Sequence, residues 1–163
     1  MATLHHLVAA GQLIKLDALD ERQQEFREIF MSPKLRDWMA KVLSELGSSW
    51  KIELTPEEQV FALTEIFAAG RPLAFGTQFN PLRPIKNGVW ELKTADVRIF
   101  GWFHRRDRFV AVVADDATRI KQIGLYAGYV GDAVRFRERL DLDEPKFVPG
   151  DDPNDVVSDW TVT

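Results

Sequence analysis

One predicted β-hairpin brings together side chains that can act on a nucleic acid. Residues 88–103, GVWELKTADVRIFGWF, predict two strands joined by a short connection. Because alternate side chains of a strand point to opposite faces, pairing Lys93 with Arg98 places both cations on one face, and Phe100 and Trp102 share it. Lysine and arginine neutralise phosphate, and aromatic rings provide flat surfaces on which unpaired bases stack. We therefore predict a nucleic-acid-binding face on this hairpin.

The register of the hairpin decides which side chains share a face. With Lys93 opposite Arg98, the other face carries the apolar residues Trp90, Leu92, Ile99 and Phe103. A connection one residue shorter would place Glu91 and Lys93 on the face of Ile99 and divide the charges between the faces. We predict the first register because it buries fewer charges. The cationic face is then either open to a ligand, as we expect, or covered by the N-terminal helices.

Further cations adjoin the predicted binding face, although the protein as a whole is acidic. They include the side chains at and beyond the hairpin tip, His104, Arg105, Arg106, Arg108 and Arg119. Residues 70–140 contain 13 Lys and Arg against 7 Asp and Glu, whereas the whole chain has a net charge of -4. A basic middle region between acidic ends indicates an anionic partner such as RNA. The alternatives are that these charges are solvated or that the acidic end of the chain covers them.

The elements before the hairpin are predicted to be mainly helical. In residues 17–30, DALDERQQEFREIF, apolar side chains recur at helical spacing. Residues 32–47 predict a second helix, with a serine N-cap and a proline at the first helical position. A short strand is expected at residues 50–54. The helix that follows starts with a capping box formed by Thr55 and Glu58.

The hairpin and the segments around it are predicted as three successive strands between a loop and a helix. The strands are expected at residues 89–93, 97–104 and 108–114. Residues 71–88 are rich in turn residues and predict a loop. A terminal helix is expected to begin near Asp132. The acidic end, residues 141–163, is expected to be irregular or mobile.

The composition excludes several kinds of site. The chain has no cysteine, so it forms neither a disulfide nor a thiolate site. No apolar run approaches the roughly 18 residues that a membrane span needs, and the first residues lack the pattern of a signal peptide. No dinucleotide, phosphate-loop or metal fingerprint appears. We therefore expect a cytoplasmic protein with no cofactor, no metal site and no membrane partner.

The order of these features resembles the RelE/HigB-like toxins of toxin–antitoxin modules. The matching features are WKIEL leading into a helix, then GRPL, GVWELK and DVRIFGWF, followed by an apolar strand. The resemblance implies an α+β fold in which a small antiparallel sheet packs against helices. It divides the chain into a helical N-terminal extension at residues 1–47, a toxin-like domain at residues 48–140 and an acidic C-terminal tail at residues 141–163.

The resemblance also implies a reaction and a set of roles. Members of this family cleave messenger RNA on the ribosome, and the 2′-hydroxyl of the RNA attacks the adjacent phosphate. By this resemblance Arg98 stabilises charge on the phosphate. Lys93 or Lys121 accepts a proton. Tyr126 or His104 supplies one.

The residues expected to bind the nucleic acid lie on the same hairpin and just beyond it: Phe100, Trp102, Arg105, Arg106, Arg108 and Arg119. The implied partners are RNA and the ribosome, together with a cognate antitoxin. The implied role is that of a toxin that inhibits translation.

Two further hypotheses belong to different classes. The first is a non-catalytic module on the same scaffold that binds and regulates a host protein. The acidic ends favour it, as does Lys93, because the family has arginine there and lysine lacks its planar fork. The second concerns regulation by residues 141–163, which carry 1 Lys against 7 Asp and Glu. Such a tail would cover the basic middle region and weaken nucleic-acid binding at low salt.

Overall fold

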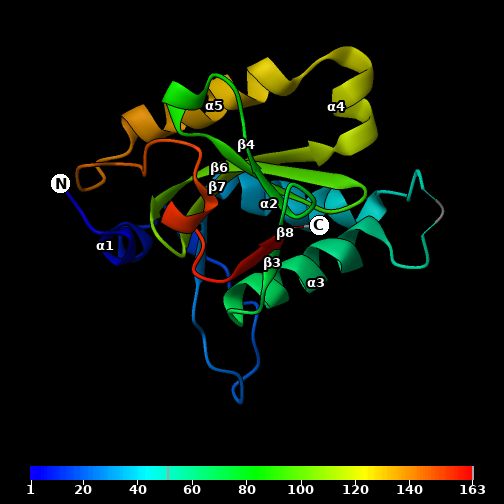
Figure 1. The fold of residues 1–163 in the computed structure, drawn as a ribbon, viewed down its shortest axis with the longest axis horizontal. Helices are drawn as coiled ribbons and strands as arrows, with labels where there is room; N and C mark the ends of the chain where they lie inside the picture. The colour runs from blue at the N-terminus through cyan, green and yellow to red at the C-terminus, as the bar shows by residue number, and fades with distance from the viewer. Residues whose placement is uncertain (51, 163) are drawn as a thin grey trace.

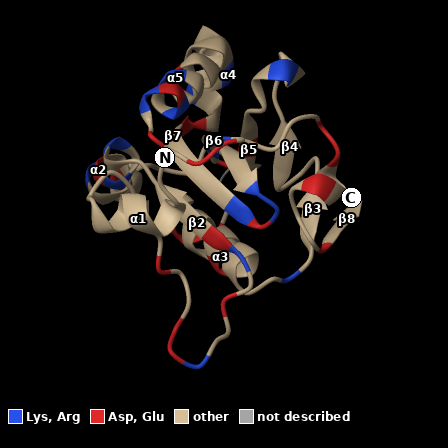
Figure 2. Ribbon diagram, turned by 90° about the vertical axis from the view of Figure 1, so that its left-hand side faces the viewer, with Lys and Arg blue, Asp and Glu red and all other residues tan. Residues whose placement is uncertain are grey.

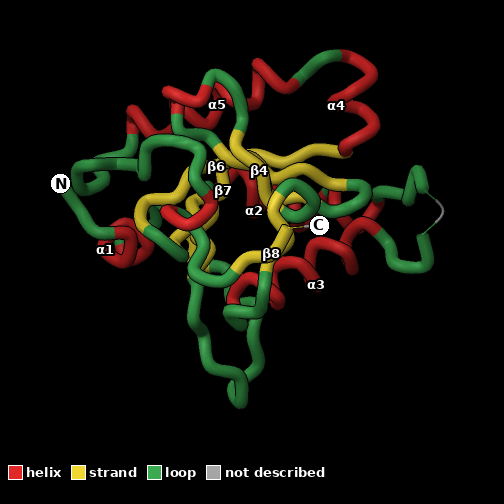
Figure 3. The backbone as a smooth tube through the Cα atoms, in the orientation of Figure 1, coloured by secondary structure: helices red, strands yellow, loops and turns green. Residues whose placement is uncertain are grey.

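The computed structural model of the protein describes residues 1–50 and 52–162. Eight strands within these residues form one mixed sheet in the order β1-β2-β7-β6-β5-β4-β3-β8. Their bounds are β1 Ile14–Lys15, β2 Glu28–Met31, β3 Leu73–Phe75, β4 Phe79–Pro81, β5 Trp90–Lys93, β6 Val97–Arg105, β7 Arg108–Asp116 and β8 Trp160–Val162. Figure 1 and Figure 3 show this sheet running through the middle of the molecule with helices on both sides.

The prediction of a small antiparallel sheet is wrong, because segments from both ends of the chain extend it. β2 pairs in parallel with β7, with Glu28 opposite Arg108 and Met31 opposite Ala111. At the other edge, β8 pairs in parallel with β3. The antiparallel strands β5, β6 and β7 form the centre of the sheet, as predicted, and the fold is α+β with a larger, mixed sheet.

Residues 17–30 do not form the predicted helix, and their last three residues belong to β2. Ile29 and Phe30 are consecutive, and each is buried in a different one of the two hydrophobic cores. A strand covered on both faces buries consecutive apolar residues, and such a run also fits helical spacing. The segment predicted as a helical extension therefore supplies two strands of the sheet, β1 and β2.

The helices form a layer on each face of the sheet. On one face, α1 (Leu4–Ala9), α4 (Ala117–Ile123) and α5 (Tyr126–Arg139) contribute to the core that contains Phe100 and Trp102. On the other face, α2 (Pro33–Lys41) and α3 (Pro56–Ala68) cover Trp90 and Phe103. Three short 3-10 helices complete the described elements: η1 Leu43–Glu45, η2 Ile85–Asn87 and η3 Pro153–Asp155.

The predicted N-terminal caps of α2 and α3 are confirmed. The Ser32 hydroxyl accepts a hydrogen bond from the Leu35 amide at 3.0 Å, and Pro33 opens α2. At α3, the Glu58 amide donates to the Thr55 hydroxyl at 3.2 Å, and the Thr55 amide donates to the Glu58 carboxylate at 3.1 Å. These reciprocal bonds are the predicted capping box.

Three other local predictions are corrected. The helix expected near Asp132 begins at Tyr126. Residues 71–88 contain β3 and β4 rather than only a loop. Of the strand expected at residues 50–54, Lys51 lies outside the described residues, and the other four residues are not in a strand.

The predicted register of the hairpin is confirmed: Lys93 lies opposite Arg98, and Leu92 opposite Ile99. A β-bulge follows Phe100, where the pairing with β7 shifts by one residue. At Gly101 a Cβ atom would lie 1.9 Å from the Val110 carbonyl oxygen, so only glycine fits this approach of the two backbones.

Apart from η3 and β8, residues 141–162 are irregular, as predicted, but they pack against the rest of the fold and are not mobile. Val156 and Val157 are buried in the core beneath the sheet. The Val148 amide donates to the Phe103 carbonyl at 2.8 Å. β8 then completes the edge of the sheet beside β3. In the part of the chain that the structure describes, no helix has the length and apolar character needed to cross a membrane.

Candidate functional site

The hairpin face predicted to be open is covered by α5. Phe100 and Trp102 have no exposed surface. The Phe100 ring contacts Tyr126 and Tyr129, with ring centroids 5.6 Å and 5.3 Å away, and the Trp102 ring lies 6.2 Å from that of Phe136. The prediction that Phe100 and Trp102 offer stacking surfaces is therefore wrong, and the cover is the C-terminal helix rather than the N-terminal helices.

Charged side chains occupy the same face at the end of these strands. Lys93, Arg98 and Asp115 are direct neighbours on β5, β6 and β7, because Arg98 pairs with both of the others. Asp115 is bound by α4 and α5: its carboxylate pairs with Arg119 and accepts a hydrogen bond from the Tyr129 hydroxyl at 2.5 Å. The sheet and the two helices therefore enclose a polar region beside the apolar core.

Glu91 lies at the centre of this polar region. It is 3 % exposed and sits on β5 two residues before Lys93, on the same face. Burial raises the pKa of its carboxyl group above the usual range, and the charges of Lys93 and Arg98 oppose that rise. A hydrogen bond with Tyr126 and the charge of Lys121 also oppose the rise in the pKa of Glu91. We refer to Glu91, Lys93, Arg98, Lys121 and Tyr126 as the Glu91 cluster.

Two atoms of the Glu91 cluster are buried without a hydrogen-bond partner among the described residues. They are Oε2 of Glu91 and Nε of Arg98. The Arg98 Nη1 group donates to the Thr94 and Val97 carbonyls, so this guanidinium is held in place by the backbone of its own turn. Buried polar atoms are nearly always paired with protein groups or with ordered water, so a water molecule or a polar group of a ligand is the expected partner of these two atoms.

The outer members of the Glu91 cluster reach the surface. Lys121 is exposed, and Lys93 and Tyr126 are half-buried. The Lys93 ammonium donates to the Gly76 carbonyl at 2.9 Å. Burial lowers the pKa of Lys93, and Glu91 opposes this shift. Burial raises the pKa of Tyr126, with a further contribution from Glu91, so this hydroxyl keeps its proton at neutral pH.

The structure brings together four of the five residues predicted to be catalytic: Lys93, Arg98, Lys121 and Tyr126. The fifth, His104, lies six residues farther along β6, a distance of ~20 Å at the rise of a strand. Its Nε2 atom is hydrogen-bonded to the Asp143 carbonyl at 3.1 Å, and burial lowers its pKa. His104 therefore does not belong to the Glu91 cluster.

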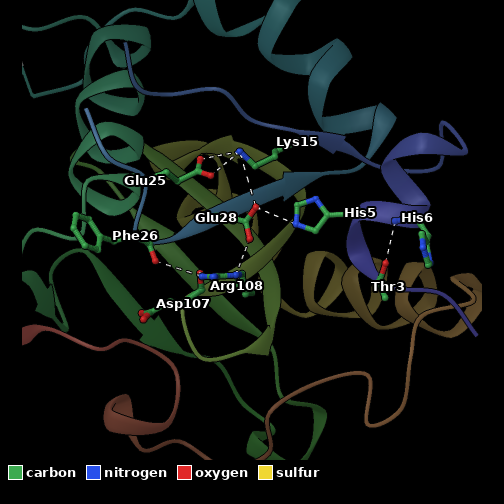
Figure 4. Close-up of polar contacts among 9 residues, drawn as sticks. All are labelled: Thr3, His5, His6, Lys15, Glu25, Phe26, Glu28, Asp107 and Arg108. Carbon is green, nitrogen blue, oxygen red and sulfur yellow. Dashed lines mark hydrogen bonds and ion pairs between the residues drawn. The ribbon is translucent and has the colours of Figure 1, made fainter. Parts of the chain in front are cut away.

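Two of the three arginines at the hairpin tip serve the fold. Arg105 donates to the Pro145 carbonyl at 2.6 Å. Arg108 pairs with Glu28 at 2.7 Å, and Figure 4 shows Glu28 between Arg108, His5 and Lys15. Arg106 is exposed. The predicted cationic tip is thus largely engaged in holding the hairpin to the N-terminal segment and to the tail.

Two of the basic residues of α5 are also bound to other protein groups. Figure 2 shows Lys and Arg on this helix together with Asp and Glu. Arg135 pairs with Asp132 at 2.5 Å. Arg137 is buried, donates to the Asn87 carbonyl at 2.7 Å, and lies over the Phe147 ring with its guanidinium carbon 3.8 Å from the ring centroid. Arg137 therefore clamps the helix to the loop before β5 and to the tail.

A groove opens next to Asp115, between α2 and the edge of β7. Its volume is about 580 Å³. Its lining combines the polar side chains of Asp115, Asp116, Arg119 and Tyr129 with the apolar side chains of Leu35, Trp38, Val42 and Leu46. Sequence reasoning missed this groove because the parallel pairing of β2 with β7, which brings α2 next to β7, was not predicted.

Sequence reasoning also missed the roles of Glu91, Asp115 and Tyr129. A signal was present for Glu91, since the predicted register already placed it on the face of Lys93 and Arg98. No local signal marked Tyr129, because its contact with Asp115 depends on how α5 crosses the sheet. Among the described residues, no group of three or more His, Cys, Asp or Glu side chains is arranged to hold a metal ion.

Comparisons with models of known protein families, with curated protein sequences and with solved structures find no match to this chain. The resemblance to RelE/HigB-like toxins therefore stays a prediction from the sequence. The geometry of the Glu91 cluster is the basis for the function proposed below.

The raised pKa of Glu91 predicts how stability changes with pH. A carboxyl group whose pKa is higher in the folded than in the unfolded protein favours folding most below its unfolded value, about 4.3, and this contribution is lost as the pH rises. The Glu91→Gln variant has no ionisable group at this position, so it does not lose stability there as the pH rises. We expect urea unfolding to show that the variant gains stability relative to the wild type between pH 4 and pH 7. Glu21→Gln, which removes an exposed carboxylate, is the control, and an equal gain in both variants would contradict the prediction.

Proposed function

We propose that this protein is a toxin-like RNA endonuclease that uses the 2′-hydroxyl of its substrate as the nucleophile, and that the Glu91 cluster is its catalytic site. The observation that carries this proposal is the convergence of Lys93, Arg98 and Tyr126 around a buried carboxylate. Groups whose pKa values are shifted by burial and by specific charged neighbours are typical of catalytic sites.

The residues of the Glu91 cluster match the needs of this reaction. Lys93 accepts the proton of the 2′-hydroxyl, since its lowered pKa favours the neutral amine that a base must have. The freed oxygen attacks phosphorus, and the bond from phosphorus to the 5′-oxygen breaks. Tyr126 gives its proton to that 5′-oxygen. The products are a 2′,3′-cyclic phosphate and a 5′-hydroxyl.

Positive charge must stabilise the transition state, because negative charge builds up on the phosphate oxygens. Lys121 is exposed and supplies charge directly at the surface. Arg98 is buried and hydrogen-bonded to the Tyr126 hydroxyl, so it acts by fixing that hydroxyl and by adding positive charge near the phosphate. Glu91 is hydrogen-bonded to Tyr126 and interacts with the charge of Lys93, so it orients the tyrosine and attracts the lysine.

The test is cleavage of RNA by the purified full-length chain, both with naked RNA and with translating ribosomes. We expect 2′,3′-cyclic phosphate ends, and no cleavage where the nucleotide before the cut carries a 2′-deoxy sugar. Lys93→Met removes the base and should lower the rate by about 100- to 10,000-fold. Lys86→Met, which removes an exposed lysine from η2, should leave the rate unchanged.

Two results would contradict the proposal. Cleavage of the 2′-deoxy substrate at an equal rate would exclude the 2′-hydroxyl as nucleophile. A folded wild-type protein that cuts RNA in neither assay would exclude the endonuclease.

A second candidate function, protein binding, is favoured by the groove beside α2. β2 ends at Met31 opposite Ala111, so among the described residues β7 has no neighbouring strand on that side beyond this point. An extended segment of a partner protein could add to such an edge, with apolar side chains resting on Trp38 and Val42. Trp38→Ala would then abolish partner binding and leave RNA cleavage unchanged.

A further inference from the structure

A second cleft lies on the same end of the molecule as the Glu91 cluster. Its volume is about 330 Å³, and it is formed where residues after η1 meet α4. Its lining consists of Ser49, Trp50, Ala117, Thr118, Lys121 and Gln122. We refer to it as the Trp50 cleft.

Trp50 is exposed yet held in a defined position. Its side chain and backbone together are 62 % exposed, whereas Trp90 and Trp102 are fully buried. The indole nitrogen Nε1 donates to the Ala95 carbonyl at 3.1 Å. The neighbouring Ser49 amide donates to the Asp96 carboxylate at 3.0 Å. A ring fixed in this way loses little conformational freedom on binding a ligand, so it is a suitable platform for stacking.

The rest of the lining fits a nucleotide. Lys121 contributes one positive charge, and the described residues that line the Trp50 cleft include no carboxylate. The Gln122 amide can both donate and accept hydrogen bonds, as the edge of a base requires, and the Thr118 hydroxyl can do the same. A flat aromatic surface beside a cation is the combination with which proteins bind single-stranded nucleic acid.

The Trp50 cleft is physically linked to the Glu91 cluster. Lys121 belongs to both. The indole of Trp50 is bonded to Ala95, in the same turn whose Thr94 carbonyl accepts a hydrogen bond from Arg98. A strand of RNA whose phosphate lies at Lys121 can therefore place a neighbouring base in the Trp50 cleft.

We infer that the Trp50 cleft binds one base of a single-stranded RNA next to the phosphate that the Glu91 cluster cleaves. The inference rests on the proposed function for the identity of the ligand. It assigns to Trp50 a role in substrate binding that does not require Trp50 to take part in the chemical step.

The test measures the binding of a fluorescent single-stranded RNA to the full-length chain by anisotropy at low salt. We expect Trp50→Ala to weaken binding by about 5- to 150-fold, the range that corresponds to loss of one stacked base. Trp50→Phe keeps a stacking ring and should recover most of the affinity. Phe61→Ala removes another exposed aromatic side chain, from α3, and should bind as the wild type does.

An abasic RNA separates stacking from a structural effect. A single abasic nucleotide at the position bound by Trp50 should weaken wild-type binding to the level of Trp50→Ala, and it should have no further effect on that variant. Circular dichroism verifies that the variants are folded.

The possible outcomes distinguish this inference from the proposed function. Trp50-dependent binding without any cleavage supports the cleft and contradicts the endonuclease. Cleavage by the wild type with unchanged binding and KM in Trp50→Ala overturns the inference and leaves the endonuclease intact. Equal losses of RNA affinity in Trp50→Ala and Phe61→Ala overturn it as well. Loss of a protein partner in Trp50→Ala, with RNA binding unchanged, also overturns it.

Discussion

Arg98→Ala should lower the rate of RNA cleavage by about 100-fold or more, and expression of this variant should no longer arrest growth. Arg98 is hydrogen-bonded to the Tyr126 hydroxyl. In the proposed reaction it adds positive charge near the phosphate, and a preorganised cation or donor of this kind contributes about 100- to 1,000-fold in rate. The measurement is single-turnover cleavage of a defined RNA, together with growth curves of expressing cells.

Two further variants make this prediction specific. Arg98→Lys keeps the positive charge but loses the planar guanidinium, so we expect only a partial recovery. Arg106→Ala removes an exposed arginine from the turn after β6, beyond the end of the strand opposite to Arg98, and should cleave normally. Arg98 also bonds to carbonyls of its own turn, so unfolding curves are required for each variant. A folded Arg98→Ala protein with wild-type activity would exclude Arg98 from the site.

Arg27→Ala is expected to destabilise the protein by about 3–5 kcal/mol, the range for removing one partner of a buried ionic network. Arg27 is fully buried. Its Nη1 group donates to the Phe67 carbonyl at 3.1 Å and to the Arg71 carbonyl at 2.9 Å, and its Nη2 group donates to the Asp159 carbonyl at 2.9 Å. Its Nε atom lies 3.3 Å from a carboxylate oxygen of Asp107. Alanine leaves these acceptors without a donor.

Urea unfolding of matched variants tests this expectation. Arg27→Lys keeps a charge but cannot reach all of these acceptors, so it should recover only part of the loss. Arg71→Ala removes an exposed ion pair with Glu65 and should cost less than about 0.5 kcal/mol. A loss of under about 1 kcal/mol for Arg27→Ala would show that these contacts contribute little.

Arg27 also explains why residues 1–47 and 141–163 are integral to the fold. Through it, the segment before β2 contacts the end of α3, the hairpin tip and the tail before β8. These partners lie 40 to 132 positions away along the chain. Their distance is the reason that no local pattern distinguished Arg27 from the surface arginines.

The helix caps and the register of the hairpin could be predicted from the sequence. The caps of α2 and α3 depend on side chains within three positions of one another, so they were predicted correctly. The hairpin register followed from burying few charges, and it already grouped Lys93 with Arg98. Glu91 was on the same predicted face, although its role as the buried centre of the site was not recognised.

The sequence by itself thus determined the central hairpin, the starts of α2 and α3 and the shared face of Lys93 and Arg98, because these depend on neighbours along the chain. The tertiary structure decided that α5 covers that face, that segments from both ends join the sheet, and that Trp50 comes next to Lys121. These features depend on contacts between residues tens of positions apart. Alternation and helical spacing describe which side of an element is apolar, and they do not specify which element covers it.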